Sequence, residues 1–182
     1  MKEFGLLRPM VDEDLEMVLD WRNAPEVRSK MYTSHVISLE EHLAWWGRTK
    51  QRDDQEYFVY ECVGTPLGVV GFTQIDYFSQ NCFWAFYASS NAPRGTGSRM
   101  EYLALNYVFK ELGLNKLSCE VLSFNETVLR LHTKFGFKKE GLFRQQHMAD
   151  GVFHDIVRFG LLESEWQQIC EEVHAKLSGN SA

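Results

Sequence analysis

The chain has 182 residues, of which 45% are hydrophobic and 14% are aromatic. This length and this composition are typical of one globular domain with a substantial core, and they exclude a disordered chain. The sequence holds 19 Lys and Arg residues against 25 Asp and Glu residues, so its net charge is -6. A charge of this sign argues against nucleic acid as the main partner.

The sequence shows no pattern typical of a secreted, membrane-bound or metal-binding protein. No run approaches the ~20 apolar residues of a membrane helix, and the segment Met1-Lys-Glu-Phe-Gly5 lacks the apolar stretch of a signal peptide. The cysteines are scattered without Cys-x-x-Cys spacing, and the histidines show no zinc-ligand spacing. We therefore expect a cytoplasmic protein with four reduced thiols, no metal and no membrane contact.

The N-terminal half of the chain combines turn signals with hydrophobic periodicity. Ser38 and Glu41 form a capping-box pattern that begins a helix. Pro25 ends an earlier amphipathic helix, and Gly64 joins two strands in a hairpin. The expected elements of this half are strands at 6–10, 56–62 and 66–75 and helices at 11–22, 26–31 and 38–48.

In the C-terminal half, the dipeptide Asp150-Gly151 between two apolar runs predicts a tight hairpin. The expected elements there are strands at 83–88, 116–122, 141–148 and 153–161, helices at 100–112 and 163–177, and a short helix within 125–137. Because strands and helices alternate along the chain, the sequence predicts an α/β class with a mixed sheet and antiparallel N-terminal strands. We expect a single domain over residues 1–182.

The segment Ala92-Pro-Arg-Gly-Thr-Gly-Ser-Arg99 stands between an aromatic strand and a helical pattern. Glycines let backbone N–H groups face a ligand, and the first turn of the following helix offers unpaired N–H groups at the positive end of its dipole. Arg94 and Arg99 add fork-shaped charged donors that suit phosphate oxygens. The sequence therefore predicts a phosphate or pyrophosphate site. It is neither a Walker loop nor a Rossmann fingerprint, because no Gly-Lys-Ser/Thr follows and the third glycine is missing.

The strand at 116–122 leads into Asn125-Glu-Thr-Val-Leu-Arg-Leu-His-Thr-Lys-Phe-Gly-Phe137, a pattern of asparagine, short helix, aromatic residue and Gly-Phe. Together with the glycine loop, this block resembles the acetyl-CoA site of the GNAT acetyltransferases, and the resemblance extends from Leu7 to about Leu162. It implies a GNAT fold, in which helices cover both faces of a mixed sheet that splays at the acetyl-CoA site. In that family the loop holds the CoA pyrophosphate, and the pantetheine lies between two splayed strands, here 83–88 and 116–122.

The resemblance implies a set of cofactor-binding residues: Phe86, Tyr87, Ala88, Arg94, Gly95, Thr96, Gly97, Ser98, Arg99 and Asn125. Arg99 departs from the family, which usually has a small residue there. Its side chain either points outward to hold a phosphate, which we favour, or crowds the loop. For Asn125, a bond to the pantetheine and a role as helix N-cap are alternatives. Backbone N–H groups of Phe86–Ala88 are expected to polarise the thioester carbonyl, as the bulged strand of the family does.

The family usually places a tyrosine before the Gly-Phe pair to protonate the departing thiolate, and here that position holds His132. Imidazole can donate a proton near neutral pH, so His132 is a candidate general acid, with packing on an amphipathic helix as the alternative. Glu120 is the second candidate catalytic residue. It would accept the amine proton through water or bind a sugar hydroxyl, unless it faces outward. Because no base is evidently paired with Cys119, we expect direct amine attack in a ternary complex.

The N-terminal third carries arginine, histidine and aromatic residues that suit an acceptor with phosphates and rings. The runs Trp21-Arg-Asn-Ala-Pro-Glu-Val-Arg28, Met31-Tyr-Thr-Ser-His35 and Ile37-Ser-Leu-Glu-Glu-His-Leu43 resemble the PseH-type N-acetyltransferases of pseudaminic acid biosynthesis. That resemblance implies acetylation of the 4-amino group of UDP-4-amino-4,6-dideoxy-N-acetyl-β-L-altrosamine, a step toward flagellin glycosylation. The residues that it implies for substrate binding are Arg22 and His42 at the nucleotide and Met31, Tyr32, Trp84 and Glu120 at the sugar.

Other functions on the same scaffold stay open. The acceptor could be a protein N-terminus, as in ribosomal-protein acetyltransferases, another small amine or an aminoglycoside, although Arg22 and Arg28 argue mildly against a polycationic drug. A non-catalytic acyl-CoA sensor is an alternative from a different class. The sequence also leaves the oligomeric state open, with a homodimer among the alternatives.

Overall fold

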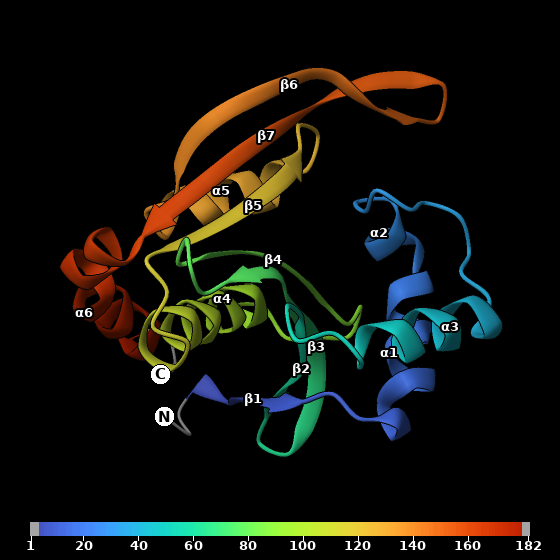
Figure 1. Cartoon of the computed structure of the whole chain (residues 1–182), viewed down its shortest axis with the longest axis horizontal. Helices are drawn as coiled ribbons and strands as arrows, with labels where there is room; N and C mark the ends of the chain where they lie inside the picture. Colours follow the sequence, from blue (N-terminus) through green and yellow to red (C-terminus); the bar gives the residue numbers. More distant parts are fainter. Residues whose placement is uncertain (1–3, 180–182) are drawn as a thin grey trace.

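A seven-stranded sheet forms the centre of the computed structural model, which describes residues 4–179 (Figure 1). Its strands follow the order β1-β2-β3-β4-β5-β7-β6, and all neighbours pair antiparallel except β4 and β5, which are parallel. The prediction of a mixed α/β sheet with antiparallel N-terminal strands is confirmed. The strands are β1 (Leu6–Pro9), β2 (Glu56–Cys62), β3 (Thr65–Asp76), β4 (Asn81–Ala88), β5 (Lys116–Leu122), β6 (Lys138–Ala149) and β7 (Val152–Leu162).

Helices cover both faces of the sheet, because side chains alternate along its strands. In β2, Phe58 and Tyr60 belong to the core that contains α4, whereas Val59 packs with residues of α1 and α3 on the opposite face. A 3-10 turn at Asp12–Asp14 precedes α1, and a π-helical turn at Tyr107–Glu111 continues α4. The helices are α1 (Leu15–Asn23), α2 (Pro25–Arg28), α3 (Leu39–Thr49), α4 (Thr96–Asn106), α5 (Glu126–Lys134) and α6 (Glu163–Gly179).

Most predicted elements lie within a few residues of their expected bounds. The Ser38 hydroxyl accepts a hydrogen bond from the N–H of Glu41 at 3.1 Å, so the predicted cap of α3 is confirmed. Val63 and Gly64 have φ values of 52° and 72°, as a two-residue hairpin turn requires. Two helices begin four residues from their expected starts. α1 begins at Leu15 and not at residue 11, because a 3-10 turn precedes it, and α4 begins at Thr96 and not at residue 100, because the second half of the glycine loop forms its first turn.

The main core lies between the sheet and helices α4, α5 and α6. On α4, Met100, Ala104 and Leu105 are completely buried, and Val108 continues this stripe into the π-helical turn. A smaller core fills the opposite face, between α1, α3 and strands β2 and β3. Among the helices of residues 4–179, none combines the length and the apolar character needed to cross a membrane.

Strands β4 and β5 separate soon after they begin. They pair only over Asn81–Phe83 with Lys116–Ser118. Beyond this point β4 stays paired with β3 as far as Ala88, and β5 stays paired with β7 as far as Leu122. The sheet therefore opens into two halves between its parallel strands, as the expected splayed fold requires.

Arg8 of β1 forms ion pairs with the 3-10 turn before α1 and with β2. Its guanidinium donates to both carboxylate oxygens of Asp14 at 2.7 Å, and its Nε donates to Glu61 of β2 at 2.6 Å. Asp14 is buried, and the hydrogen bonds from Arg8 hold the pKa of its carboxyl below the usual value. This pair fixes the turn that leads into α1 against the edge of the sheet.

We predict that Asp14→Asn lowers the free energy of unfolding by roughly 2 kcal/mol, because it removes a bidentate, charge-assisted pair. Urea denaturation at pH 7 measures this loss, with Asp20→Asn on the exposed side of α1 as the control. Since folding lowers the pKa of Asp14, its contribution is present above about pH 4 and is lost as the pH falls further. Equal losses in the two variants, or a difference that persists in acid, would contradict this assignment.

Candidate active site

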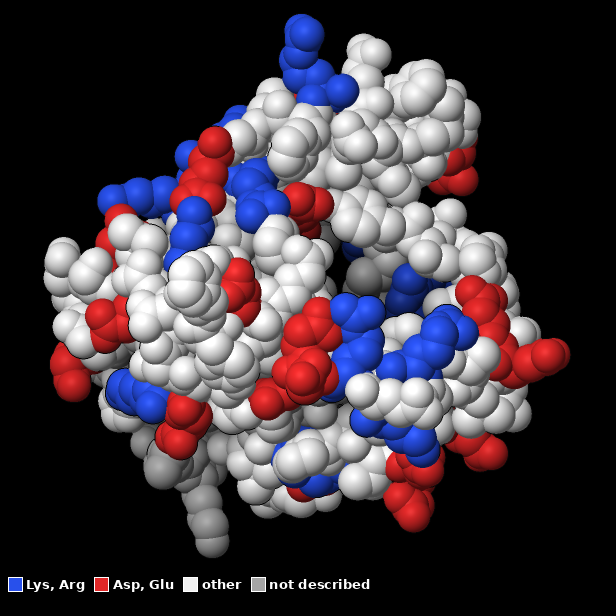
Figure 2. All heavy atoms as spheres, in the orientation of Figure 1, with Lys and Arg blue, Asp and Glu red and all other residues white. Residues whose placement is uncertain are grey.

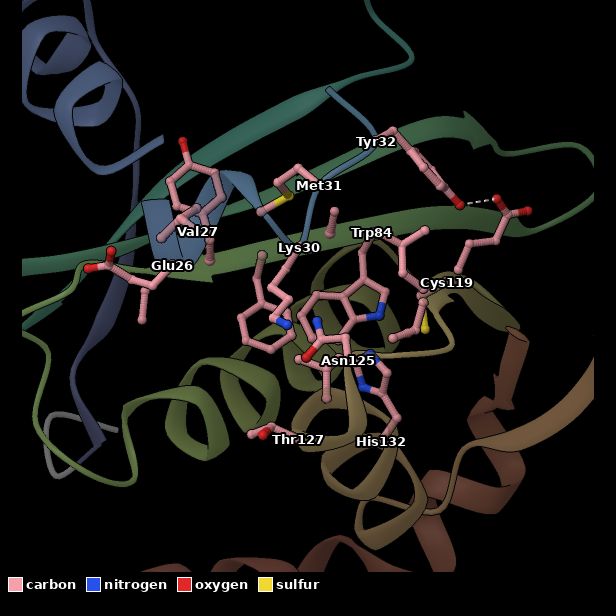
Figure 3. A pocket seen from close by; sticks show the side chains of 18 of the residues that line it. Glu26, Val27, Lys30, Met31, Tyr32, Trp84, Cys119, Asn125, Thr127 and His132 are labelled. Carbon is pink, nitrogen blue, oxygen red and sulfur yellow. Dashed lines mark hydrogen bonds between the residues drawn. The ribbon is translucent and has the colours of Figure 1, made fainter. Parts of the chain in front are cut away.

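A cavity of about 440 Å³ occupies the gap between β4 and β5 (Figure 3). Its walls come from both strands, from α5, and from the segment after α2. Residues of the N-terminal third and of the C-terminal half thus meet at one place, as the sequence analysis expected. The predicted site residues that line this cavity are Met31, Tyr32, Trp84, Phe86, Tyr87, Ala88, Glu120, Asn125 and His132.

The inner edge of β4 offers backbone groups to this cavity. The N–H of Ser89 donates to the carbonyl of Leu67 on β3 at 2.8 Å. Because hydrogen bonds alternate along an antiparallel strand, Trp84, Phe86 and Ala88 turn their N–H and C=O groups away from β3 and toward the gap. These groups can bond to a ligand that lies beside β4.

The β3–β4 ladder shows no bulge at Phe86–Ala88, unlike the bulged strand of the family. The register runs unbroken from the pair Gly68 and Ala88 to the pair Thr73 and Phe83, and the irregularity of this ladder comes after Thr73. The separation from β5 already frees the inner edge of β4, so its N–H groups reach the cavity without a bulge.

The glycine loop lies beside the cavity at the start of α4. Gly95 is the N-cap of α4 with a φ of +91°, a conformation that favours glycine. Thr96–Ser98 form the first turn. The N–H of Thr96 donates to the carbonyl of Pro93 at 3.1 Å, so the N–H groups of Gly97 and Ser98 are the ones left for a ligand. A Cβ added at Gly97 would lie 3.5 Å from Leu131 and 3.6 Å from Phe86, so this turn directly adjoins a wall residue of the cavity.

The polar side chains of the loop divide between surface and interior. Arg94 is exposed, whereas Thr96 is buried and its hydroxyl donates to the carbonyl of Pro93 at 2.7 Å. Arg99 is half-buried and lies near the Tyr60 hydroxyl, where it opposes the rise in the Tyr60 pKa that burial causes. Arg99 therefore reaches toward β2, and Arg94 is the more exposed of the two loop arginines.

His132 lies at the cavity wall with a buried carboxylate beside it. The side chains of His132 and Glu101 are 2% and 0% exposed, and Nδ1 of His132 lies 2.8 Å from a Glu101 oxygen. Burial by itself lowers the His132 pKa, but the negative charge of Glu101, with a contribution from Cys119, outweighs it and raises the pKa to about 10. The carboxylate thus favours the imidazolium form of His132, which is able to donate a proton.

Asn125 occupies the N-cap position of α5, but its side chain makes no capping hydrogen bond. The amide instead belongs to the wall of the cavity, on the side of α5 (Figure 3). Asn125 is therefore the N-cap of α5 by its backbone position only. Its side chain does not cap the helix and is available to a ligand.

Tyr32 and Glu120 are joined by a hydrogen bond, although 88 residues separate them in the sequence (Figure 3). The Tyr32 hydroxyl donates to one Glu120 oxygen at 2.8 Å, and Arg158 of β7 donates to the other at 3.0 Å. Arg158 also lies over the Phe83 ring, with its guanidinium carbon 3.9 Å from the centroid. Both oxygens of Glu120 are therefore engaged at the side of the cavity.

A second cavity, of about 360 Å³, adjoins the first on the side of α1 and α3. Met31, Ala85 and Tyr87 line both cavities. Arg22 and His42 line the second cavity. The structure thus separates the residues predicted for a nucleotide from those predicted for a sugar, but places the two groups in neighbouring cavities.

Arg22 is held inside the second cavity by one hydrogen bond. Its Nη2 donates to the carbonyl of Thr33 at 2.9 Å, whereas its Nη1 is buried without a partner among residues 4–179. Burial lowers the pKa of Arg22. The His42 ring stacks on Trp45 with centroids 5.1 Å apart. In the space-filling view, Lys and Arg side chains gather beside the hollow between the N-terminal helices and the sheet (Figure 2).

Two residues at the site, Glu101 and Arg158, were not predicted. Glu101 precedes the buried Leu105 and Val108 by four and seven residues, so an acidic residue within an apolar helical stripe was the available signal. Arg158 pairs with Glu120 in the β5–β7 register, which no local pattern reveals. Within residues 4–179, no cluster of His, Cys, Asp and Glu is arranged to hold a metal ion.

A mixed sheet that opens between two parallel strands, beside a glycine loop at a helix N-terminus, defines an N-acetyltransferase of the GNAT class. The chain matches the family described as "Acetyltransferase (GNAT) domain" over residues 6–138. It belongs to this family, and it is an acetyl-CoA-dependent N-acetyltransferase.

Relatives with different acceptors resemble the chain to similar degrees. Acetyltransferase PseH of Campylobacter jejuni is 28% identical over 125 residues, which cover 69% of this chain and 77% of that protein. Spermidine N(1)-acetyltransferase of Escherichia coli is 24% identical over 161 residues, which cover 88% and 87%. Spermidine N-acetyltransferase from Vibrio cholerae, solved in complex with CoA and spermine, superposes with a TM-score of 0.86 at 21% identity over 91% of this chain and 99% of that chain. At this identity the structural likeness shows the fold alone.

We predict that Gly97→Val abolishes CoA binding while the fold persists. The added Cβ makes ordinary van der Waals contacts, but the larger side chain occupies the approach to the first N–H groups of α4. Calorimetric titration with CoA measures the binding, and circular dichroism measures the fold. Gly47→Val in α3 is the control, because nothing lies within 4 Å of a Cβ there. Unchanged affinity in the Gly97 variant would exclude the loop as the pyrophosphate site.

Proposed function

We propose that this enzyme acetylates the 4-amino group of UDP-4-amino-4,6-dideoxy-N-acetyl-β-L-altrosamine, the nucleotide sugar of pseudaminic acid biosynthesis. The observation that carries the proposal is the second cavity, which adjoins the acetyl-transfer cavity and holds Arg22 among aromatic rings. An arginine whose Nη1 has no partner within residues 4–179 suits a phosphate oxygen. Trp45 and Tyr57, in edge contact with centroids 5.0 Å apart, offer flat surfaces to a base.

The charge on the acceptor side favours an anionic acceptor over a polycationic one. Two arginines, Arg22 and Arg48, line the second cavity against one carboxylate, Glu41. The first cavity has Lys30 beside the carboxylates of its wall. A polyamine would bring several positive charges beside these side chains, and their repulsion would weaken its binding. Of the two carboxylates that line the first cavity, Glu26 and Glu120, the second is already paired with Arg158 at 3.0 Å. The similarity to PseH supports the same proposal, while the similarity to the spermidine acetyltransferases makes a polyamine the necessary comparison.

The same geometry fits acetyl-CoA, which supplies the acetyl group as a thioester. The first turn of α4, Thr96–Ser98, would hold the pyrophosphate, and Gly97 leaves room for its approach. The inner edge of β4 would bond to the pantetheine amides, together with the Asn125 side chain. These residues are neighbours in the fold, so one elongated molecule can contact all of them.

The acetyl group then passes to the amine by direct attack in a ternary complex. The N–H of Phe86 faces the gap and polarises the thioester carbonyl. Glu120, held by Tyr32 and Arg158, orients the sugar and receives the amine proton through water. His132 gives its proton to the CoA sulfur, because its raised pKa keeps it protonated at neutral pH.

Release of CoA from acetyl-CoA tests the proposal with four acceptors: the UDP-4-amino sugar, spermidine, a peptide with a free N-terminus and an aminoglycoside. Turnover with the UDP-sugar alone is the expected result. Turnover only with spermidine, the peptide or the aminoglycoside would overturn it. CoA binding without turnover of any acceptor would also overturn it and would favour an acyl-CoA sensor.

We predict that Arg22→Met raises the KM for the UDP-sugar about tenfold or more and leaves kcat within about twofold, because one charge-assisted bond to phosphate is lost before the chemical step. The KM for acetyl-CoA stays unchanged, since Arg22 lines the second cavity and not the first. Arg52→Met, in the exposed ion pair with Asp54, is the control. A fall in kcat at constant KM would show that Arg22 acts elsewhere.

A further inference from the structure

We propose that Glu101 is a positioning residue, which holds the His132 imidazole in one orientation and keeps it protonated for proton transfer to the CoA sulfur. The inference rests on the proposed role of His132. It adds the residue that makes a histidine effective where the family usually has tyrosine.

The two side chains come from different helices and meet inside the core. Glu101 lies in the second turn of α4, and His132 lies near the end of α5. Their atoms Oε1 and Nδ1 are 2.8 Å apart. The His132 ring is also packed against Trp84 and Phe137, with centroids at 5.5 and 5.0 Å. Because Nδ1 bonds to Glu101, Nε2 is the nitrogen that remains for a proton transfer at the cavity wall.

Two titratable groups in residues 4–179 face His132: Glu101 from α4 and Cys119 from β5. The expectation that no base lies beside Cys119 is therefore wrong, because the imidazole interacts with its side chain. Strands β4 and β7 present aromatic rings to it, from Trp84, Phe86 and Phe159. Among rings alone, burial would favour the neutral imidazole. The carboxylate of Glu101 reverses this preference, so the protonation of His132 depends on the charge of one side chain.

A purely structural role does not account for Glu101. Its Oε2 atom is buried without a partner among residues 4–179, and burial raises its pKa. An unpaired carboxylate oxygen in a core costs free energy, and apolar residues of similar size often serve stability equally well. An apolar side chain would extend the buried stripe of Leu105 and Val108 without this cost. The effect of the carboxylate on His132 explains its presence.

The proton balance needs no further reactant. Amine attack forms the C–N bond, breaks the C–S bond and leaves the electron pair on sulfur. The Nε2 proton of His132 passes to that sulfur, and the Nδ1 proton stays on the hydrogen bond to Glu101. The amine loses one proton to Glu120 through water, and this proton then returns through water to His132, so the net transfer moves one proton from nitrogen to sulfur.

The test compares wild type with Glu101→Gln, which preserves size and removes charge. NMR titration of the histidine ring signals, with His132→Gln to identify the signal of His132, measures its protonation and needs no acceptor. We expect His132 to stay protonated in the wild type to about pH 10. In Glu101→Gln we expect it to be neutral above about pH 6.5. Glu111→Gln, an exposed glutamate at the end of the π-helical turn, is the matched control.

Kinetics supplies the second measurement, with whichever amine turns over. At pH 8, kcat of Glu101→Gln falls roughly tenfold to a hundredfold, and its decline with rising pH begins near the ordinary histidine pKa. The KM for acetyl-CoA stays unchanged, and Glu111→Gln behaves as wild type. If the UDP-sugar is not a substrate, the NMR titration still tests the role of Glu101, because it needs no acceptor.

Two results would overturn the inference. One is a wild-type His132 that is already neutral at pH 7.5, a result that does not depend on the Glu101 variant. The other is a His132 titration or an alkaline limb of kcat that is the same in Glu101→Gln and wild type.

Discussion

The early separation of β4 from β5 is the constraint on which the site depends. Strands satisfy their backbone groups by pairing, yet these two share only the pairs from Asn81–Phe83 to Lys116–Ser118. The groups left on their inner edges face a cavity, and a ligand with amides of its own can pair with them. The glycine loop follows β4 closely, so the N-terminus of α4 reaches the same ligand. The proposed cofactor site is therefore built mainly from backbone groups of β4, β5 and α4.

The side chains around this opening divide the chemistry between two environments. On one side, His132 and Glu101 form a pair that is almost completely removed from water, where a charge interacts strongly with its neighbour. On the other side, Arg22 and Lys30 line more open cavities, where an anionic group of the acceptor can be bound and released. Glu120 stands between them, held by bonds from two distant segments. Substitutions in the His132–Glu101 pair and substitutions in the acceptor cavities can therefore alter these two functions independently of each other.

Local chemistry made part of this site predictable, and contacts between distant segments hid the rest. The spacing of Gly95 and Gly97 before a helical pattern indicated the loop, and β5 has its predicted bounds because turn residues limit its apolar run. Glu101 and Arg158 could not be found in this way, since their partners lie 31 and 38 residues away. A family resemblance indicated Tyr32, and a carboxylate inside a strand indicated Glu120, but no local pattern contains the bond that joins them.

The short ladder between β4 and β5 also has a mechanical consequence. Within residues 4–179 it is the ladder that connects the β1–β4 half of the sheet to the β5–β7 half, and side-chain packing provides the remaining connection. A molecule that bonds to both inner edges acts as an additional strand and ties the halves together. Because it binds the folded state, it also stabilises that state, and the gain rises with the logarithm of its concentration once the site is saturated. In the proposed binding mode, acetyl-CoA is thus a structural member of the sheet as well as a reactant.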